Sequence, residues 1–504
     1  MKVTVSIPRD PAGLAAMCGG RLFVRGHALP FPITRICTDS READGETLFC
    51  AMRGERVDGH DYIPTAARAG CRTFLCEYLP EGWENISPES PFGEGPMFAI
   101  VVEDTVPALA RLAAAVRAEA LSEMQVVAVT GSVGKTTTKE MIAAVMAAAS
   151  PRSYKKDGNF NSTVGLPLSV TEIPADTAHA VLEMGMSGRG EIAAMTAAAR
   201  PDIALIINIG TSHMEQLGSR ENIAAAKLEI AEGLREGGIL LVNGDEPLLA
   251  RAESVIPADT RVLRLTLADA PDADFSARSI TPSAEGMSFD LATPDGVLSD
   301  LFVPAVGIHM VWAGAFAAAV GCLCGFDPAH VRAGLAAYRP AALRQSRRTV
   351  GNVTFIEDCY NAAPESMRAA LDALELTAAS SASARRIAVL GSMMALGEDS
   401  PARHREVGRA LADRAPDLLV TVGELASHIA DGARDGGLPS DRILVLGADI
   451  APDAPNAPDP TDAYPAIAAR IAERILPHDL LLFKASRAMR LEALADAVGA
   501  CINK

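Results

Sequence analysis

The sequence predicts an α/β protein built from three domains. A chain of 504 residues is too long for a single hydrophobic core. Its hydrophobic content of 49% and charged content of 22% are typical of a globular protein. Two series of strand-length apolar segments alternate with helical stretches, one in the middle of the chain and one near its end. We therefore expect domains at 1–122, 123–340 and 341–504.

The first 122 residues indicate a mixed α/β domain. Segments 47–52 (TLFCAM) and 97–103 (MFAIVVE) are typical of strands, and 105–121 is typical of an amphipathic helix that closes the domain. Residues 81–96 are rich in Pro, Gly and acidic side chains, which predicts a surface loop.

The middle of the chain predicts a mostly parallel sheet with helices on both faces. Four apolar runs, each followed by a helical stretch, lie at 126–131, 179–185, 202–210 and 237–245. Each run ends in polar or glycine residues. Because ligands of parallel α/β sheets bind at the carboxyl ends of the strands, these ends predict a ligand site.

A second series of four runs predicts a Rossmann-like third domain. The runs are 386–391 (RIAVLG), 417–423 (DLLVTVG), 442–447 (RILVLG) and 479–486 (DLLLFKAS), each followed by a helical stretch. The Ala-, Asp- and Pro-rich segment 447–465 predicts a loop within this domain.

Composition excludes several classes of protein. The net charge of −17 argues against a nucleic-acid binder, which needs clustered Lys and Arg. The nine cysteines are mostly scattered singly, which fits a reducing compartment. The apolar segment 306–326 is Ala- and Gly-rich, contains His309 and has no basic flank, so it predicts a buried helix instead of a membrane span. With no secretory signal at the amino terminus, we expect a cytoplasmic protein without membrane insertion.

A glycine turn between a strand and a helix predicts phosphate binding. The glycines of Gly131-Ser132-Val133-Gly134-Lys135-Thr136 permit backbone N–H groups to surround phosphate oxygens, and the helix adds its positive dipole end. Lys135 would neutralise phosphate charge and the Thr136 hydroxyl would bind Mg²⁺. The turn departs from the full phosphate-loop pattern because Val129 occupies its first glycine position. The residues that we predict to contact the nucleotide here are Gly131, Ser132, Gly134, Lys135, Thr136 and Thr137.

Three later residues are ambiguous when each is taken alone. Glu183 ends a strand and could bind Mg²⁺, although it could equally be a solvated strand-end carboxylate. His213 follows another strand and could be an ordinary loop residue. Lys227 lies among Ala and Ile on a helix that Ser219 could cap, and such a lysine is usually exposed with its stem on apolar surface.

In this order, however, these segments resemble the Mur ligases, the ATP-dependent amide-bond-forming enzymes of peptidoglycan synthesis. The resemblance is carried by 130–136 (TGSVGKT), 183–185 (EMG), His213 and 226–230 (AKLEI). It extends over nearly the whole chain through five more segments: 38–63 with Asp39-Ser40-Arg41 and Arg53-Gly54-Glu55, 158–167 (GNFNSTVGLP), 357–367 (EDCYNAAPESM), 390–408 (LGSMMALGEDSPARHREVG) and 481–487 (LLFKASR).

The resemblance implies a reaction and its substrates. It is greatest to the subgroup that adds D-alanyl-D-alanine to UDP-N-acetylmuramoyl-tripeptide. In that reaction a substrate carboxylate attacks the γ-phosphate of ATP, and the dipeptide amine then displaces phosphate from the acyl phosphate. The family uses two Mg²⁺ ions, which implies Thr136 and Glu183 as ligands of one, and His213 and a carbamylated Lys227 as ligands of the other. Lys135, His213 and Lys227 are the implied catalytic residues.

Further roles follow from the same resemblance. Nucleotide contacts are implied for Arg344, Asp358, Tyr360 and Asn361, and substrate contacts for Ser40, Arg41, Asn159, Asn161 and Lys484. His404 is implied along the ligase cleft, although it could simply lie on a helix face. The subgroup also implies a monomer with no nucleic-acid partner.

The sequence departs from the family where the adenine should bind. The family motif H-N-x-x-N-A is here His309-Met310-Val311-Trp312-Ala313-Gly314, so both asparagines are absent. A side-chain amide makes paired bonds to a base, and neither Met nor Ala can do so. Either the base is bound differently, with Trp312 nearby, or ATP binding is weakened. Other departures are Ser392 for Asp, Ala395 for Glu and Ala363 for Asn.

Three alternatives stay open at this stage. The diamino-acid-adding Mur ligases carry a D-N-P-R motif that is absent from this sequence. The folylpolyglutamate type shares the ATP core but has no need of the segment at 38–63. A degenerate paralogue that binds ATP for regulation is supported by the lost asparagines and opposed by the intact Lys135, Glu183, His213 and Lys227.

Overall fold

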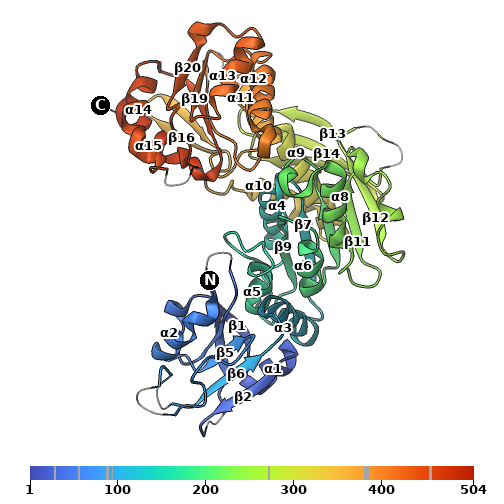
Figure 1. The fold of residues 1–504 in the computed structure, drawn as a ribbon. Helices are drawn as coiled ribbons and strands as arrows, with labels where there is room; N and C mark the ends of the chain where they lie inside the picture. Colours follow the sequence, from blue (N-terminus) through green and yellow to red (C-terminus); the bar gives the residue numbers. More distant parts are fainter. Residues whose placement is uncertain are drawn as a thin grey trace.

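The computed structural model describes residues 1–27, 30–54, 57–86, 90–92, 95–268, 270, 273–379, 385–452, 454 and 457–503. Three sheets follow one another along the chain, and the central one lies between the other two (Figure 1). The predicted α/β class with three domains is confirmed.

The first domain is a six-stranded mixed sheet with the order β1-β3-β4-β5-β6-β2. Strands β3 to β6 are parallel, and β1 and β2 add antiparallel edges. One face packs on α1 and α3, and the other packs on α2, Trp83 and Phe92. The elements are β1 Lys2–Arg9, α1 Pro11–Cys18, β2 Arg21–Arg25, β3 Ile33–Cys37, β4 Thr47–Cys50, α2 Ile63–Arg68, β5 Thr73–Cys76, β6 Met97–Val101 and α3 Thr105–Ala120.

The segment 81–96 differs in part from the predicted surface loop. Trp83 and Phe92 are buried and pack edge-to-face. The buried Arg25 guanidinium donates hydrogen bonds to the carbonyl oxygens of Trp83 (2.8 Å) and Gly95 (3.0 Å). Composition pointed to solvent, but the two aromatic side chains bury a large apolar surface against the sheet.

The central sheet has nine strands in the order β15-β14-β13-β12-β11-β10-β7-β9-β8. It is parallel from β8 to β13, as predicted, and then continues through the antiparallel pairs β13–β14 and β14–β15. The elements are β7 Gln125–Thr130, α4 Lys135–Ala149, β8 Ser153–Lys155, α5 Gly165–Glu172, β9 His179–Glu183, α6 Glu191–Ala199, β10 Ile203–Ile206, α7 Met214–Leu217, α8 Arg220–Leu228, β11 Ile239–Asn243, β12 Arg261–Thr266, β13 Phe275–Pro282, β14 Met287–Thr293, β15 Gly296–Val303, α9 Ile308–Leu323 and α10 Pro328–Ala337.

Helices cover both faces of this sheet, as the sequence predicts. Because side chains alternate along a strand, Val126 and Ala128 of β7 pack toward α3, α5 and α6, whereas Val127 and Val129 pack toward α4, α9 and α10. The predicted helical stretch after β11 is wrong, since only two short 3₁₀ turns (Pro247–Leu249 and Ala252–Ser254) precede β12.

The apolar segment 306–326 forms the buried helix α9, as predicted. Its Ala and Gly residues pack on the sheet and on α4, where small side chains permit close approach. In the described parts of the chain, no helix is both long and apolar enough to cross a membrane. The boundaries at 122 and 340 stay predictions, because α3 packs on both neighbouring domains.

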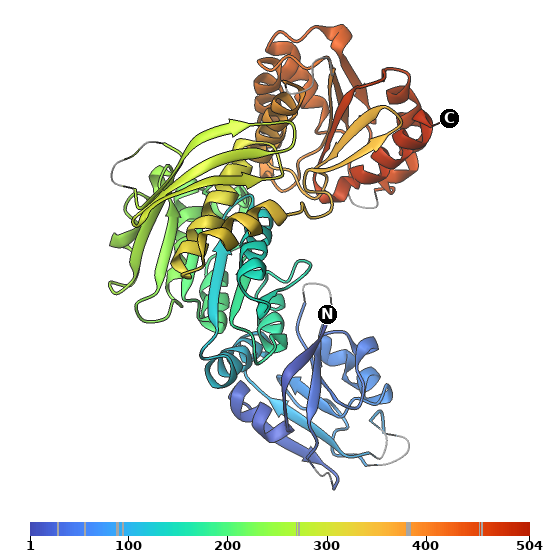
Figure 2. The ribbon, with the colours of Figure 1, turned by 180° about the vertical axis from the view of Figure 1, so that it is seen from behind.

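The third domain has five parallel strands and one antiparallel edge, in the order β16-β17-β21-β18-β19-β20. Helices α11, α12 and α13 cover one face, and α14 and α15 cover the other (Figure 2). The elements are β16 Ser346–Val350, β17 Val353–Glu357, α11 Pro364–Ala379, β18 Arg386–Gly391, α12 Ser400–Ala412, β19 Leu418–Val422, α13 Ser427–Asp435, β20 Ile443–Leu446, α14 Tyr464–Ala472, β21 Leu480–Lys484 and α15 Leu491–Ile502.

Candidate active site

A cavity of about 520 Å³ lies where the central and third domains meet. Its central-domain wall comes from the turn before α4, the loops that follow β8, β9 and β10, and the start of α9. Its third-domain wall comes from Arg344, the segment 358–369 and the end of β21. The cavity therefore lies at the carboxyl ends of parallel strands, as the sequence predicts.

The glycine turn is shaped by two tight backbone positions. Gly134 has φ +82°, a conformation that side chains disfavour, and it precedes the first residue of α4. A Cβ on Gly131 would lie 2.4 Å from Cγ1 of Ile207. The amides of Ser132 and Val133 donate to Oδ1 of Asn208 at 2.9 and 3.0 Å. The N–H groups at the start of α4 lack acceptors within the helix and remain available to an anion.

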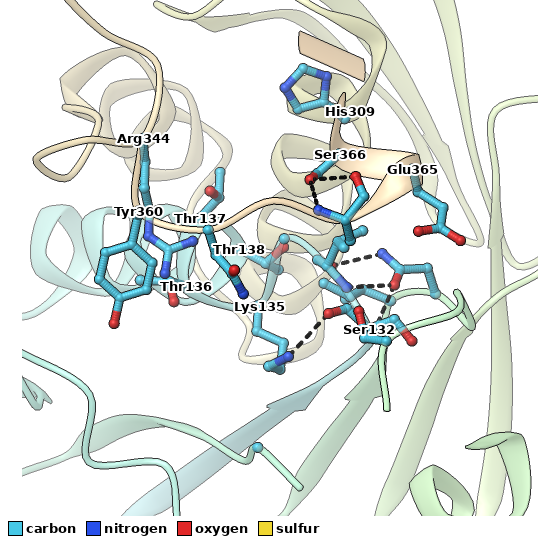
Figure 3. Close-up of a pocket in the computed structure, with 18 of the residues that line it drawn as sticks. Ser132, Lys135, Thr136, Thr137, Thr138, His309, Arg344, Tyr360, Glu365 and Ser366 are labelled. Carbon is cyan, nitrogen blue, oxygen red and sulfur yellow. Dashed lines mark hydrogen bonds between the residues drawn. The ribbon is translucent and has the colours of Figure 1, made fainter. Parts of the chain in front are cut away.

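Lys135 folds back over this turn. Its ammonium donates to the carbonyl oxygens of Gly131 (2.7 Å) and Ser132 (3.3 Å), as Figure 3 shows in part. Burial lowers the pKa of Lys135, and the nearby Glu183 carboxylate offsets part of that shift. The residue is placed to neutralise an anion that enters the turn.

Glu183 holds two polar side chains at the end of β9. Its Oε2 accepts a hydrogen bond from the Thr136 hydroxyl (2.8 Å), and its Oε1 accepts one from Nδ2 of Asn161 (2.9 Å). The backbone N–H of Gly185 donates to the Asn161 carbonyl (2.8 Å), which fixes this loop beside the strand. Carboxylate and hydroxyl oxygens are ligands that Mg²⁺ prefers.

His213 and Lys227 lie in an electropositive region behind this cluster. His213 has φ +66° and lines the cavity. Burial lowers the His213 pKa, Lys135 and Lys227 lower it further, and Glu191 offsets part of that shift. Lys227 is only 2% exposed, which makes the alternative of a snorkelling surface lysine wrong. It does not itself line the cavity.

The surroundings of Lys227 favour an uncharged amine. Burial and then the Lys135 charge lower its pKa well below the ordinary value. Among the residues that the structure describes, no carboxylate forms an ion pair with it. A neutral amine is the form that can react with CO₂, because only that form has a free electron pair.

Five predicted residues line the opposite wall: Arg344, Asp358, Tyr360, Asn361 and Lys484. Arg344 stacks its guanidinium 4.0 Å from the centre of the Tyr360 ring. The buried Lys484 ammonium pairs with Oδ2 of Asp358 (2.6 Å) and donates to the carbonyl of Asn361 (3.1 Å). These contacts place the side chains of Arg344, Tyr360, Asp358 and Lys484 around one end of the cavity.

The start of α9 supplies an apolar and aromatic wall. Trp312 lines the cavity and stacks on Phe316 with 5.9 Å between ring centroids. Met310 and Ala313, which replace the expected asparagines, are both buried. Nε2 of His309 lies 2.9 Å from the side-chain nitrogen of Gln345, so the helix start contacts the segment that enters the third domain.

Besides Lys227, three predicted residues from elsewhere in the chain are not brought to this cavity. Ser40 is buried in the first domain, and Arg41 is exposed there with its guanidinium on the Asp39 carboxylate (2.6 and 2.9 Å). His404 is fully buried in α12. Its Nε2 accepts from the Met393 N–H (2.9 Å) and its Nδ1 donates to the Ser400 carbonyl (2.7 Å). Both nitrogens of His404 are therefore used within the fold. Glu55 lies outside the described residues.

Sequence reasoning missed two residues that organise the site. Asn208 binds the glycine turn with both ends of its amide, and its signal was a polar residue directly after the β10 apolar run. Glu365 lies in the first turn of α11, and its carboxylate accepts two hydrogen bonds from Thr211. Asn159, in contrast, lines the cavity as expected for a substrate-loop residue.

Fold and site together define a three-domain α/β protein in which a glycine turn at a helix start, suited to bind phosphate, faces a cavity between two domains. Family models match this chain at residues 32–117 (Mur ligase family, catalytic domain), 129–321 (Mur ligase middle domain) and 344–487 (Mur ligase, glutamate ligase domain). The chain belongs to the Mur ligase family, as its motifs predicted.

Individual relatives resemble nearly the whole chain. The UDP-N-acetylmuramoyl-tripeptide–D-alanyl-D-alanine ligase of Bacillus subtilis (strain 168) is 37% identical over 460 residues, which cover 91% of this chain and 92% of that protein. A crystal structure of MurF from Acinetobacter baumannii has a TM-score of 0.84 and 28% identity, with 99% of this chain and 100% of that chain covered. The MurF ligase of Thermotoga maritima in complex with ADP has a TM-score of 0.75 and 26% identity, with coverage of 93% and 97%.

Proposed function

We propose that this chain is an ATP-dependent ligase that joins D-alanyl-D-alanine to UDP-N-acetylmuramoyl-tripeptide. The observation that carries the proposal is the cavity in which the Lys135 turn, the Glu183 cluster and the Asp358–Lys484 pair face one another across two domains. The proposal is supported by relatives of that name that span about nine-tenths of both chains.

The reaction follows from the chemistry of a carboxylate. A carboxylate is a poor electrophile in water, so its oxygen attacks the γ-phosphorus of ATP and ADP leaves. The dipeptide amine then attacks the resulting acyl phosphate at its carbonyl carbon, phosphate leaves, and the amine nitrogen loses a proton. The free N–H groups at the start of α4 and the Lys135 ammonium would hold the phosphates, while the Asp358 and Lys484 wall would exclude water from the activated carbonyl.

The residues present also fit divalent cations. Thr136 and Glu183 would hold one Mg²⁺, and His213 with a carbamate on Lys227 would help to hold a second. Bound Mg²⁺ offsets the repulsion between the attacking carboxylate and the triphosphate. Within the described residues there is no group of three or more His, Cys, Asp or Glu side chains that could bind a metal without other ligands. Phosphate oxygens and water would therefore complete each coordination shell.

Carbamylation would change the sign of the charge near His213. A neutral Lys227 amine gains CO₂ and becomes an anion, and the reaction releases one proton. Two positive neighbours, Lys135 and a bound cation, would stabilise that anion. The low pKa of Lys227 and its lack of a carboxylate partner among the described residues support this assignment.

The adenine would lie against the α9 wall. With Ala313 and Met310 in place of amides, the base would be held by stacking on Trp312 instead of paired hydrogen bonds. The uridine end of the precursor would bind the first domain near Ser40 and Arg41, which leaves the peptide carboxylate to reach the cavity.

The deciding experiment measures phosphate release by the purified protein with Mg-ATP. The four reaction mixtures contain UDP-N-acetylmuramoyl-tripeptide, D-alanyl-D-alanine, both or neither. We expect release only when both are present. ADP binding with no release in any mixture would instead support the regulatory alternative, and release with a diamino acid in place of the dipeptide would support the diamino-acid-adding alternative.

The substrates and the free cysteine thiols indicate the cellular compartment of this activity. All nine cysteines are free, and six of them are buried. We propose a monomer in the reducing cytoplasm, where the nucleotide-linked precursor and ATP are both present. Gel filtration against globular standards tests the monomer, which a molecular mass near twice 52.6 kDa would contradict.

A further inference from the structure

The contact between Glu365 and Thr211 joins two domains beside the glycine turn. Glu365 belongs to the first turn of α11 in the third domain, and Thr211 belongs to the loop after β10 in the central domain. Oε1 of Glu365 accepts hydrogen bonds from the Thr211 N–H (3.1 Å) and from its hydroxyl (2.9 Å). Figure 3 shows Glu365 near Ser132 of the turn.

The Thr211 loop is itself fastened to the glycine turn. The N–H of Gly210 donates to the Ser132 hydroxyl at 2.8 Å. The amide of Asn208 accepts from the N–H groups of Ser132 and Val133 and donates to the Val133 carbonyl (2.8 Å). His213 follows two residues after Thr211. A displacement of Thr211 would therefore shift both the glycine turn and His213.

The approach of the two domains at this point is close. A Cβ on Gly210 would lie 3.1 Å from Cβ of Ser132 and 3.3 Å from the Glu365 carboxyl carbon. A glycine at 210 therefore permits the carboxylate to reach Thr211. Two other polar contacts join these domains: Gln345 meets His309, and the Arg347 guanidinium donates to the Ala284 carbonyl (3.0 Å). Both lie next to the segment that connects the domains, so they restrict the rotation of the third domain less than the Glu365 contact does.

The Glu365 carboxylate differs from the other carboxylates of the cavity in its hydrogen bonding. Glu183 and Glu191 each have both oxygens hydrogen-bonded, and Asp358 is paired with Lys484. Oε2 of Glu365 is buried and, among the described residues, has no partner. A desolvated carboxylate oxygen destabilises the contact, whereas the two Thr211 donors stabilise it. Opening the contact returns Oε2 to water, which offsets part of the free energy lost when the two hydrogen bonds break.

We propose that Glu365 is a positioning residue that docks the third domain on the Thr211 loop and so assembles the two walls of the cavity. The inference rests on the proposed ligase function for its kinetic consequence and on the structure alone for its effect on domain arrangement. Because the contact needs an acceptor oxygen and not a negative charge, a glutamine at 365 can replace it and an alanine cannot.

The first test measures domain arrangement without any substrate. Small-angle scattering of the full chain compares wild type with E365A, E365Q, T211V and the matched control E375Q, which removes an exposed carboxylate from the same helix. We expect a larger radius of gyration for E365A, wild-type values for E365Q and E375Q, and an intermediate value for T211V. Equal radii for wild type, E365A and T211V would overturn the proposal.

The second test measures phosphate release with saturating and limiting substrates. We expect E365A to lower kcat about tenfold, as loss of hydrogen bonds to a charged group predicts, with ADP affinity within about threefold of wild type. E365Q should recover most of the rate. In a double-mutant cycle, E365A and T211V should be less than additive because they break one contact. Additive effects, or an E365Q variant as slow as E365A, would contradict the docking role.

The two tests separate this inference from the proposed function. Should wild type release no phosphate, the ligase proposal fails, and the scattering comparison still decides whether Glu365 docks the domains. Thermal unfolding of each variant shows whether it is folded. If E365A does not fold, the comparison of T211V with wild type decides the test.

Discussion

At the scale of single residues, the positive charges around the glycine turn decide what the site can hold. Burial and the Lys135 charge lower the pKa of Lys227, which has no carboxylate partner among the described residues, and burial and Arg344 lower the pKa of Lys135. Burying a second ammonium beside the first would be unfavourable. The arrangement therefore favours a ligand or modification that brings negative charge, which triphosphate and a carbamate both do.

Lys227→Ala tests the carbamate directly. We expect the rate of phosphate release to fall by about a hundredfold or more, a loss typical of removing one group that stabilises developing charge. Added bicarbonate should not restore it, because alanine offers no amine. The control is wild type freed of dissolved CO₂, whose rate should fall and then recover when bicarbonate is added. Full activity in Lys227→Ala would exclude the carbamate.

Trp312→Ala tests how the base is held. Stacking of a nucleobase on an aromatic ring contributes about 1–3 kcal/mol, so the KM for ATP should rise roughly 5- to 150-fold while kcat changes little. Trp312→Phe keeps an aromatic face and should lie near wild type. An unchanged KM in Trp312→Ala would place the base elsewhere in the cavity.

At the scale of elements, how strands and helices are joined decides which side chains meet. The β7 turn, the end of β9 and the loop after β10 converge because their strands are parallel neighbours in the order β10-β7-β9. In the third domain, α12 is joined to the end of β18 through His404, which binds the Met393 N–H and the Ser400 carbonyl at once. That histidine is structural, which predicts a pH effect on folding instead of catalysis.

His404 should make stability depend on pH below neutrality. Burial lowers its pKa to about 4 in the folded chain, against an ordinary value of 6.5. Between these values the unfolded chain binds more protons, so stability present above pH 6.5 is lost as the pH falls toward 4. The expected loss is about 3 kcal/mol in the free energy of unfolding. Urea unfolding of wild type and His404→Gln, measured from pH 4 to 7, tests this. If the free energy of unfolding depended on pH in the same way in both proteins, the prediction would be wrong.

At the scale of the whole molecule, three domains must act on one reaction. In both views the central domain lies between the first domain and the third (Figures 1 and 2). The residues proposed to bind the uridine nucleotide, Ser40 and Arg41, therefore lie outside the cavity that holds the glycine turn. A substrate that reaches both must span two domains, and chemistry that excludes water requires the domains to close around it.

Small-angle scattering with ligands tests closure. A compact chain of this length has a radius of gyration of about 23 Å. We expect the radius of gyration of the ligand-free protein to exceed that value. A non-hydrolysable ATP analogue added together with UDP-N-acetylmuramoyl-tripeptide should lower the radius of gyration toward it. The nucleotide analogue alone should produce a smaller change, because it contacts two domains and not three. No compaction with both ligands would argue against closure.

Much of this protein was determined by its sequence alone. The apolar runs at 126–131, 179–185, 386–391 and 417–423 predicted strands because short continuous apolar runs fit a sheet covered on both faces, and the glycine turn predicted a phosphate site because glycines permit a close approach of the backbone to an anion. The order of these motifs also specified the family. Sequence reasoning overlooked the antiparallel β13–β15 extension, although Met287, Phe289 and Leu291 of β14 alternate with more exposed residues, and it did not foresee the missing helix after β11.

Only the tertiary structure decided which residues work together. It buried Lys227 and so lowered the pKa of its amine, used both nitrogens of His404 within the fold, and brought Glu365 onto Thr211 across 154 positions of the chain. Burial, pairing and contact between domains depend on which distant segments pack side by side. These properties arise only in the packed molecule, so the local sequence around any one residue does not determine them.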